Sequence, residues 1–275
     1  MLKHTFCHSP RLNALNEQSL WKRGYLTWED IIWAKELPLT DKQSQAALDT
    51  CRRSAFHLGN GDAGFFYDIL PTKEHWRLFK DFRKQTAYFD IETSGLDHDK
   101  HHITTIVLYD GEKLRHYVYG KNLEDFGKDI EHYKLIISYN GKSFDAPFIR
   151  KALNIPLNHA HIDLRYILNS LGYRGGLKSC ERQLKINRPG LEEIDGFMAI
   201  LLWEHYKKLG SKRALETLLA YNALDVINLE ILMIIAYNQK ISATPFNHLR
   251  IPIPIAPQMT FLPDKKIIQK IKLTI

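Results

Sequence analysis

Cysteine is scarce in this sequence. The 275 residues include three, Cys7, Cys51 and Cys180, which lie far apart and form no CxxC pair. An odd number of widely spaced cysteines does not make a disulfide framework of the kind found in secreted proteins. The cysteine content therefore favours a reducing compartment, and the predicted location is the cytoplasm.

Long uncharged apolar segments are missing as well. The most apolar stretch, 227–236, contains Glu230 and is shorter than a membrane span, so it predicts a buried helix. The first residues, Met1 to Phe6, lack the apolar core of a signal peptide. We therefore expect no signal peptide and no membrane partner.

A nucleotide-binding loop is not evident either. The glycine-rich stretch 59–64 lacks the Lys-Ser/Thr ending of a P-loop, and no clear helix start follows it. This stretch predicts a plain loop. No other segment indicates a small-molecule cofactor, so none is expected.

The charge that is present is moderately positive. Thirty-eight Lys and Arg residues against 31 Asp and Glu residues give a formal net charge of +7 and a pI of about 9.1. This excess fits a polyanionic partner such as nucleic acid, but many other soluble proteins carry a similar excess. The apolar content of 44% is ordinary for a globular protein with a buried core.

Residues 1–84 predict a small helical region. Thr27 and Thr40 each precede acidic residues in the manner of helix N-caps, and a further helix is expected over 73–83. Three tryptophans occur in this region: Trp21, Trp28 and Trp33. They fit the core of a helical module, which we favour, or a platform on which nucleotide bases stack.

Residues 85–240 predict an α/β domain, and 241–275 predict a proline-containing basic tail. Apolar runs of strand composition alternate with amphipathic stretches, a pattern that predicts a mixed sheet flanked by helices. The expected strands are 86–89, 103–109, 114–119 and 135–139. The expected helices are 123–133, 145–153, 180–184, 195–209 and 212–237.

Two carboxylates follow the first expected strand. In Tyr88-Phe89-Asp90-Ile91-Glu92-Thr93 the acids Asp90 and Glu92 are two residues apart, so on a strand they point to the same face. Carboxylates that close repel one another and take up a proton unless a cation lies between them. The pair predicts either a metal site or a strand end with solvated acids.

Two more acids occur where a sheet fold gathers its functional groups. Asp145 begins a helix just beyond the apolar strand 135–139, which suits a site residue as well as an ordinary N-terminal helix acid. Asp225 lies in a largely apolar helix, with Tyr221 one turn earlier on the same face. An acid in such surroundings needs a partner or a cation, so Asp225 is a candidate metal ligand.

Other polar residues are weaker candidates. Asn140 and Phe144 are expected to shape a substrate pocket, with Phe144 placed to stack on a base, or to serve in packing alone. Arg174 and Lys178 lie in a glycine-rich loop that suits contacts with phosphate, or that carries solvated charges only. Asp163 follows another apolar segment and is expected to support the site indirectly or to be structural.

The candidates fall into three motifs in chain order. They are Asp90-x-Glu92, Asn140-x3-Phe144-Asp145 and Tyr221-x3-Asp225. This set resembles the motifs of the DEDD (DnaQ-like) exonuclease superfamily, and the tyrosine of the third motif matches its DEDDy branch. The histidine branch is disfavoured because Ala220 stands where that branch has its histidine.

Further segments are similar to the YprB-like predicted exonucleases. These segments are Gly176-Leu177-Lys178-Ser179, Arg188 and Tyr221-Asn222-x2-Asp225-Val226. The early segments Leu20-Trp21 and Thr27-Trp28-Glu29-Asp30 look like the N-terminal module of that group. The resemblance is good over residues 85–238, weak over the first 80, and absent from the tail.

The resemblance implies a ribonuclease H-like fold and a metal-dependent exonuclease. The implied reaction hydrolyses single-stranded DNA or RNA from its 3′ end and releases nucleoside monophosphates. Asp90, Glu92, Asp145 and Asp225 would be the catalytic acids, and Tyr221 would orient the attacking water.

Charge arguments favour the same site. Four converging acids destabilise a fold unless cations neutralise them, and carboxylates suit Mg²⁺ or Mn²⁺. Two such ions about 4 Å apart form a site for hydrolysing a phosphodiester. We expect Asp90, Glu92 and Asp225 to hold two divalent ions, with Asp90 bridging both. Asp145 is expected to act through water.

Two alternative functions stay open. One is a structure-selective endonuclease on the same fold, which would cut a circular single strand. The other is a non-catalytic nucleic-acid-binding module, which would bind without metal and with a steep dependence on salt.

Overall fold

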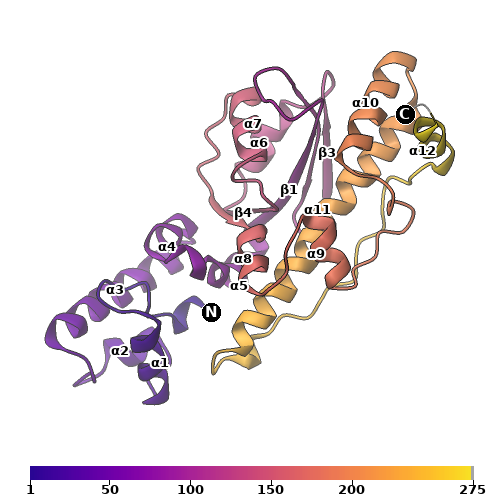
Figure 1. The fold of residues 1–275 in the computed structure, drawn as a ribbon. Helices are drawn as coiled ribbons and strands as arrows, with labels where there is room; N and C mark the ends of the chain where they lie inside the picture. Colours follow the sequence, from indigo (N-terminus) through magenta and orange to yellow (C-terminus); the bar gives the residue numbers. More distant parts are fainter. Residues whose placement is uncertain (274–275) are drawn as a thin grey trace. The chain divides into compact units, whose positions relative to one another are not determined.

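The computed structural model describes residues 1–273 and divides into two compact units. A helical unit comprises Met1–Gln85 and Tyr237–Pro252, and a sheet unit comprises Thr86–Ala236 and the chain from Ile253 onward (Figure 1). Helix α11 (Lys212–Ser242) contributes residues to both units. The predicted domains 1–84, 85–240 and 241–275 stay a prediction.

The helical unit is built from short helices with strong N-terminal caps. Its α-helices before the sheet are α1 (Ala14–Lys22), α2 (Trp28–Ile32), α3 (Asp41–Gly59), α4 (Ala63–Ile69) and α5 (Leu78–Phe82). Asn13, Thr27 and Thr40 each form a capping box, in which the cap side chain and the side chain three residues later exchange hydrogen bonds with backbone amides. Two of these caps, Thr27 and Thr40, are the ones that the sequence predicts.

Three local expectations for this unit need correction. The stretch 59–64 is a loop only over 60–62, because Gly59 ends α3 and Asp62 caps α4 by accepting a hydrogen bond from the Phe65 amide at 3.0 Å. The expected helix 73–83 consists of a 3₁₀ helix, Thr72–Arg77, followed by α5. Trp33 is 82% exposed, so the core position predicted for it is wrong, whereas Trp21 and Trp28 are buried.

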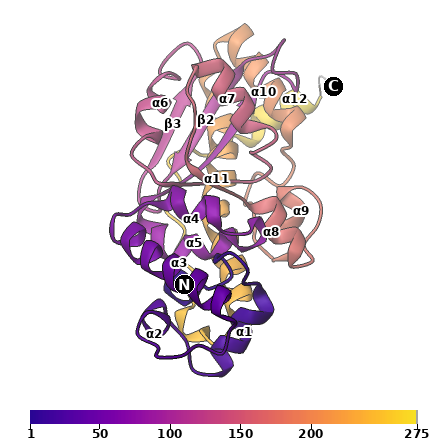
Figure 2. The same cartoon turned by 90° about the vertical axis from the view of Figure 1, so that its left-hand side faces the viewer.

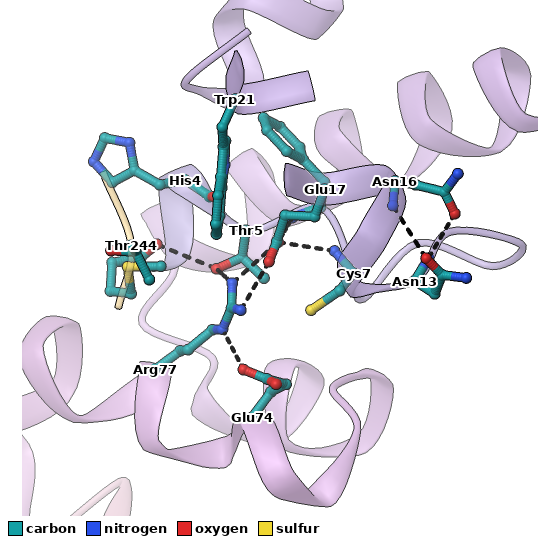
Figure 3. Close-up of polar contacts among 12 residues, drawn as sticks. His4, Thr5, Cys7, Asn13, Asn16, Glu17, Trp21, Glu74, Arg77 and Thr244 are labelled. Atoms are coloured by element: carbon teal, nitrogen blue, oxygen red, sulfur yellow. Dashed lines mark hydrogen bonds and ion pairs between the residues drawn. The ribbon is translucent and has the colours of Figure 1, made fainter. Parts of the chain in front are cut away.

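A buried ion pair joins the segments of the helical unit (Figure 3). Arg77 donates to both carboxylate oxygens of Glu17, at 2.8 and 3.0 Å, and through Nε to Glu74 at 2.7 Å. Glu17 also accepts from the backbone amides of Phe6 and Cys7 at 2.6 and 3.1 Å. Both partners are almost fully buried, and their hydrogen bonds offset the cost of removing two charges from water.

This pair predicts a large stability loss on neutralising one partner. Glu17→Gln leaves the Arg77 guanidinium buried beside a neutral group, so the free energy of unfolding should fall by about 3 kcal/mol. Urea denaturation followed by circular dichroism measures the change. Glu36→Gln, at an exposed position of the same unit, is the control and should change stability by less than about 0.5 kcal/mol. Equal stability of the two variants would contradict the role given to the pair.

The sheet unit contains a mixed five-stranded sheet. Its strands are β1 (Thr86–Thr93), β2 (Ile103–Tyr109), β3 (Leu114–Val118), β4 (Leu135–Ser138) and β5 (Ala160–Asp163). Their order across the sheet is β3-β2-β1-β4-β5. The pairs β1–β2 and β2–β3 are antiparallel, and β1–β4 and β4–β5 are parallel. This confirms the predicted α/β fold, a mixed sheet flanked by helices.

Helices pack on both faces of the sheet. The remaining α-helices of this unit are α6 (Asp125–Ile130), α7 (Asp145–Leu153), α8 (Leu164–Ser170), α9 (Leu177–Gln183), α10 (Gly196–Leu209) and α12 (Lys265–Lys272). Phe89 and Ile91 of β1 share a core with Phe126 of α6 and Ile149 of α7. Asp90, which alternates with them, faces α11 instead. Figure 1 shows β1 with α6 and α7 on one side and α11 on the other, and Figure 2 looks onto the sheet from the side of α6 and α7.

The last two helices carry features that bear on the sequence predictions. Part of the predicted tail forms α12, whose Ile267, Ile268 and Ile271 pack in one cluster with α10 and α11. Helix α11 is long and apolar enough to cross a membrane by length and composition, yet 89% of its most apolar window is buried inside the fold. Such burial is that of a core helix, as predicted for 227–236.

Candidate active site

Strand β1 carries two of the predicted acids to the face opposite the α6–α7 core. The strand continues to Thr93, four residues beyond its predicted end, so Asp90 and Glu92 belong to the strand itself. Phe89 and Ile91, which alternate with them, are buried on the other face. The pairing with β2 shifts register between Glu92 and Thr93, so an irregularity in the ladder directly follows the second acid.

Helix α11 brings a third acid to the same place. One carboxylate oxygen from each of Asp90, Glu92 and Asp225 lies within 4.8 Å of the other two. Glu92 is 9% exposed and Asp225 is 5% exposed, so these groups have little contact with water. Oxygen ligands in such a group are the kind that Mg²⁺ and Mn²⁺ prefer.

Asp145 lies beside these three acids rather than among them. It is the first residue of α7, just beyond the end of β4, and its Oδ1 accepts a hydrogen bond from the Ile91 amide at 3.2 Å. That amide belongs to the residue between Asp90 and Glu92, so the side chain points at β1. The fourth predicted acid therefore adjoins the cluster through the strand backbone.

The acids alter one another's protonation. Burial, and then repulsion from the neighbouring carboxylates, raises the pKa of Asp90 and of Glu92 well above the ordinary range. Burial raises the pKa of Asp145 to about 7, against the opposing hydrogen bond from Ile91. Burial likewise raises the pKa of Asp225, although the Arg188 guanidinium opposes it. A bound cation would favour the ionised forms of all four groups.

Tyr221 stands one turn before Asp225 on α11 and is 4% exposed. Burial, followed by the charges of Asp225 and Glu92, raises its pKa far above the usual range, so the hydroxyl keeps its proton. Two cations lie over its ring: Lys178 Nζ is 4.3 Å and Arg188 Cζ is 5.3 Å from the ring centroid. The ring is therefore held next to the acids.

Asn222 is a site residue that sequence reasoning missed. Its Nδ2 donates to Asp90 Oδ2 at 2.8 Å, and its Oδ1 accepts from Thr105 Oγ1 at 3.1 Å. The amide thus fixes the Asp90 side chain from α11 and is itself oriented by β2. A fully buried amide in an otherwise apolar helix face is the sequence signal that could have indicated this role.

Arg188 and Glu181 form a second missed feature. Arg188 makes an ion pair with Asp225, and its Nη1 donates to both carboxylate oxygens of Glu181 at 2.9 Å. Glu181 also accepts from Asn228 Nδ2 at 2.7 Å. The sequence places Arg188 in a turn and leaves Glu181 within a short helix, so neither position alone indicates that they meet.

A pocket of about 760 Å³ opens in the sheet unit at the ends of β4 and β5. Its lining residues are Tyr139, Asn140, Arg165, Asn169, Arg174, Gly175, Gly176 and Leu177. The predicted residues Asn140 and Arg174 thus share one pocket, with Arg165 as a second guanidinium. Phe144 and Lys178 are not among these lining residues.

Asp163 holds the wall of this pocket in place. Its carboxylate accepts from the backbone amides of Asn140 at 2.8 Å, Arg165 at 3.0 Å and Lys142 at 3.2 Å. Asn140 has a φ of 62°, a left-handed conformation that asparagine tolerates better than most residues. Asp163 therefore takes the structural role, one of the two expected for it.

The other two predicted substrate residues lie elsewhere. Phe144 is partly buried against the core that lies beneath α7, with its ring 5.1 Å from that of Phe148. Lys178 donates to the Ile194 carbonyl and lies over Tyr221, so it faces the acids. The glycine-rich loop before Lys178 thereby connects the pocket to the acid cluster.

Comparison with known families places this fold. Residues 87–237, more than half of the chain, match the sequence model RNase_H_2, described as RNase_H superfamily. The chain belongs to the RNase H superfamily. Every acid of the cluster, together with Tyr221 and Asn222, lies within the matched residues. No curated protein matches the sequence.

Some solved structures are similar to part of this chain at low sequence identity. The family B DNA polymerase of Pyrobaculum calidifontis shares 17% identity over 60% of this chain (TM-score 0.42), which corresponds to 26% of the polymerase. Brucella melitensis NrnC shares 19% identity over 60% of this chain and 78% of its own (TM-score 0.42). The Aedes aegypti Nibbler EXO domain shares 13% identity over 72% and 92% (TM-score 0.40).

The raised pKa values predict how stability depends on pH when metal is removed. A carboxyl group whose pKa rises on folding stabilises the fold at low pH, and this contribution is lost as pH rises through the folded pKa. In EDTA, Asp145 should therefore make the protein less stable as pH rises from about 4 to about 7. Asp145→Asn should reduce this slope in melting-temperature scans, whereas exposed Asp68→Asn should not. Parallel curves for Asp145→Asn and wild type would contradict the assignment.

Proposed function

We propose that this chain is a metal-dependent nuclease, a 3′–5′ exonuclease of the DEDDy type related to the YprB-like group. The observation that carries the proposal is the meeting of Asp90, Glu92 and Asp225 within 4.8 Å in an RNase H superfamily fold. Asp145 and Tyr221 adjoin this group, so the four acids and the tyrosine of the motifs lie together. Acids with raised pKa values that receive few hydrogen bonds fit a site that binds cations.

The donor set suits two divalent ions. Asp90, Glu92 and Asp225 would hold Mg²⁺ or Mn²⁺, and Asp145 would act on them through water. When bound, such ions supply a hydroxide nucleophile and stabilise the charge that develops on the leaving oxygen of a phosphodiester. Asn222 keeps Asp90 in one orientation through its 2.8 Å hydrogen bond, so this carboxylate is preorganised.

Tyr221 is the group that orients the attacking water. Its hydroxyl keeps its proton and lies next to the acids, so it can donate one hydrogen bond and accept another. The cations over its ring, Lys178 and Arg188, restrict where the hydroxyl points. Orientation of the nucleophile lowers the barrier by reducing the entropy lost in reaching the transition state.

The pocket at the ends of β4 and β5 suits the strand of nucleic acid. Arg165 and Arg174 offer guanidinium groups to phosphates, and Asn140 and Asn169 offer amides to sugars or bases. Single-stranded DNA or RNA with a free 3′ end is the proposed substrate. In this proposal Lys178 contacts the phosphate at the acids, and Phe144 stacks on the terminal base from the rim of α7.

Digestion of a labelled oligonucleotide tests this function. With Mn²⁺, the protein should shorten a 5′-labelled single strand one nucleotide at a time. Asp90→Asn and Asp225→Asn should each lower the rate at least about a thousandfold, because each removes a metal ligand. Glu112→Gln, at the exposed turn between β2 and β3, is the control and should digest like wild type.

Two other results of these assays would indicate an endonuclease or a non-catalytic binding module. Cleavage of a circular single strand would identify an endonuclease. Salt-dependent binding with no hydrolysis at any metal concentration would identify a binding module. If both acid variants digest as fast as wild type, the acids are not the catalytic site.

The role of Tyr221 predicts a selective kinetic effect. Tyr221→Phe keeps the ring and its packing but removes the hydroxyl, so kcat should fall by about tenfold to a hundredfold while KM stays nearly constant. Steady-state kinetics on a fluorescent oligonucleotide measures both constants. The melting temperature should stay within about 2 °C of wild type. An unchanged kcat would remove Tyr221 from the mechanism.

A further inference from the structure

Glu181 forms a buried ion pair with Arg188, and the proposed chemistry leaves Glu181 without a task. Glu181, on α9, is fully buried, and Arg188, in the turn that follows, is 7% exposed. Arg188 Nη1 lies 2.9 Å from each carboxylate oxygen of Glu181. Burying both charges costs free energy that a contact between apolar groups would not cost, so stability alone does not account for the pair.

Helix α11 contacts both members of the pair. Asn228 Nδ2 donates to Glu181 Oε1 at 2.7 Å, and Arg188 Nη2 makes an ion pair with Asp225 Oδ1. Asp225 and Asn228 are three residues apart and therefore lie on the same face of the helix. The four residues close a ring in which Asp225, a proposed metal ligand, is held by a side chain from outside its own helix.

The ion pair fixes one oxygen of Asp225. A carboxylate has two oxygens, so a guanidinium on Oδ1 restrains the side chain and leaves Oδ2 for a cation. A ligand held in this way loses less rotational freedom when the cation binds. Arg188 therefore acts on the reaction through Asp225, as a positioning residue.

A positive charge next to a metal ligand also repels the metal. In a buried site, one unit of positive charge at short range weakens the affinity for a divalent ion, because Coulomb repulsion is screened less there than in water. The carboxylate of Glu181 cancels this charge without joining the group formed by Asp90, Glu92 and Asp225. The pair can thus position Asp225 while adding no net charge to the site.

We propose that Arg188 positions Asp225 and that Glu181, by neutralising Arg188, sets how tightly the acid cluster binds a divalent cation. This inference rests on the proposed metal-dependent function. It assigns a task to Glu181, which belongs neither to the group formed by Asp90, Glu92 and Asp225 nor to the residues given above as lining the pocket.

The test measures binding of Mn²⁺ alone, without substrate. Glu181→Gln keeps a side-chain oxygen that can accept from Arg188 but removes the negative charge. By isothermal titration calorimetry its affinity for Mn²⁺ should be at least about tenfold weaker than that of wild type, because the guanidinium is no longer neutralised. Adding Arg188→Met to this variant removes the repelling charge and should recover affinity to within about threefold of wild type.

The chain offers a matched control. Glu17, in the helical unit, is also a buried carboxylate, and both of its oxygens accept hydrogen bonds from a buried arginine, Arg77. Glu17→Gln should lower the melting temperature as Glu181→Gln does and leave the Mn²⁺ affinity unchanged. A general loss of stability is thereby separated from an effect on the cation.

Three results would overturn the inference. They are unchanged Mn²⁺ affinity in Glu181→Gln, equal weakening in Glu17→Gln, or a double variant no tighter than Glu181→Gln. If Glu181→Gln does not fold, the double variant, which buries no charge at the pair, gives the test. Its kcat should be at least about tenfold below that of wild type, because Arg188 no longer holds Asp225. A wild-type kcat in the double variant overturns the inference. Wild-type protein that binds no Mn²⁺ would instead remove the proposed metal function itself.

Discussion

The burial of several carboxylates at one point is the constraint on which the sheet unit depends. Asp90, Glu92 and Asp225 meet within 4.8 Å, and Asp145 adjoins them. Such a cluster opposes folding, because desolvation and mutual repulsion both disfavour its charged form. The surrounding groups compensate for this: the Asn222 amide donates to Asp90, the Ile91 amide donates to Asp145, and Arg188 pairs with Asp225.

Two kinds of group compensate for the buried acids: neutral hydrogen-bond donors and a charged guanidinium. Neutral donors, such as the Asn222 amide, orient an acid without changing the charge of the site. Arg188 carries a full positive charge, and its ion pair with Glu181 neutralises that charge. These contacts hold the acids in place, and they add no net positive charge to the site.

Much of this arrangement could be predicted from local patterns. The apolar run before Asp90 and the alternation of Asp90 with Ile91 specify a strand with both acids on one face, and the four-residue spacing of Tyr221 and Asp225 specifies one helix face. The contacts of Glu181 and Arg188 could not be predicted, because they depend on how α9 and the turn after it pack against α11. Trp33 could not be placed either, since a tryptophan near two buried ones looks the same in sequence whether it is covered or 82% exposed.

Helix α11 holds four of the interacting positions, Tyr221, Asn222, Asp225 and Asn228, within two turns. One inserted residue between any two of them would rotate the rest by about 100° and remove them from the site together. The loop that carries Arg174 has no such helical register to lose. Relatives of this chain should therefore vary in length in the loop between α8 and α9 while keeping a fixed spacing inside α11. A sequence alignment with a gap inside this part of α11 would be wrong.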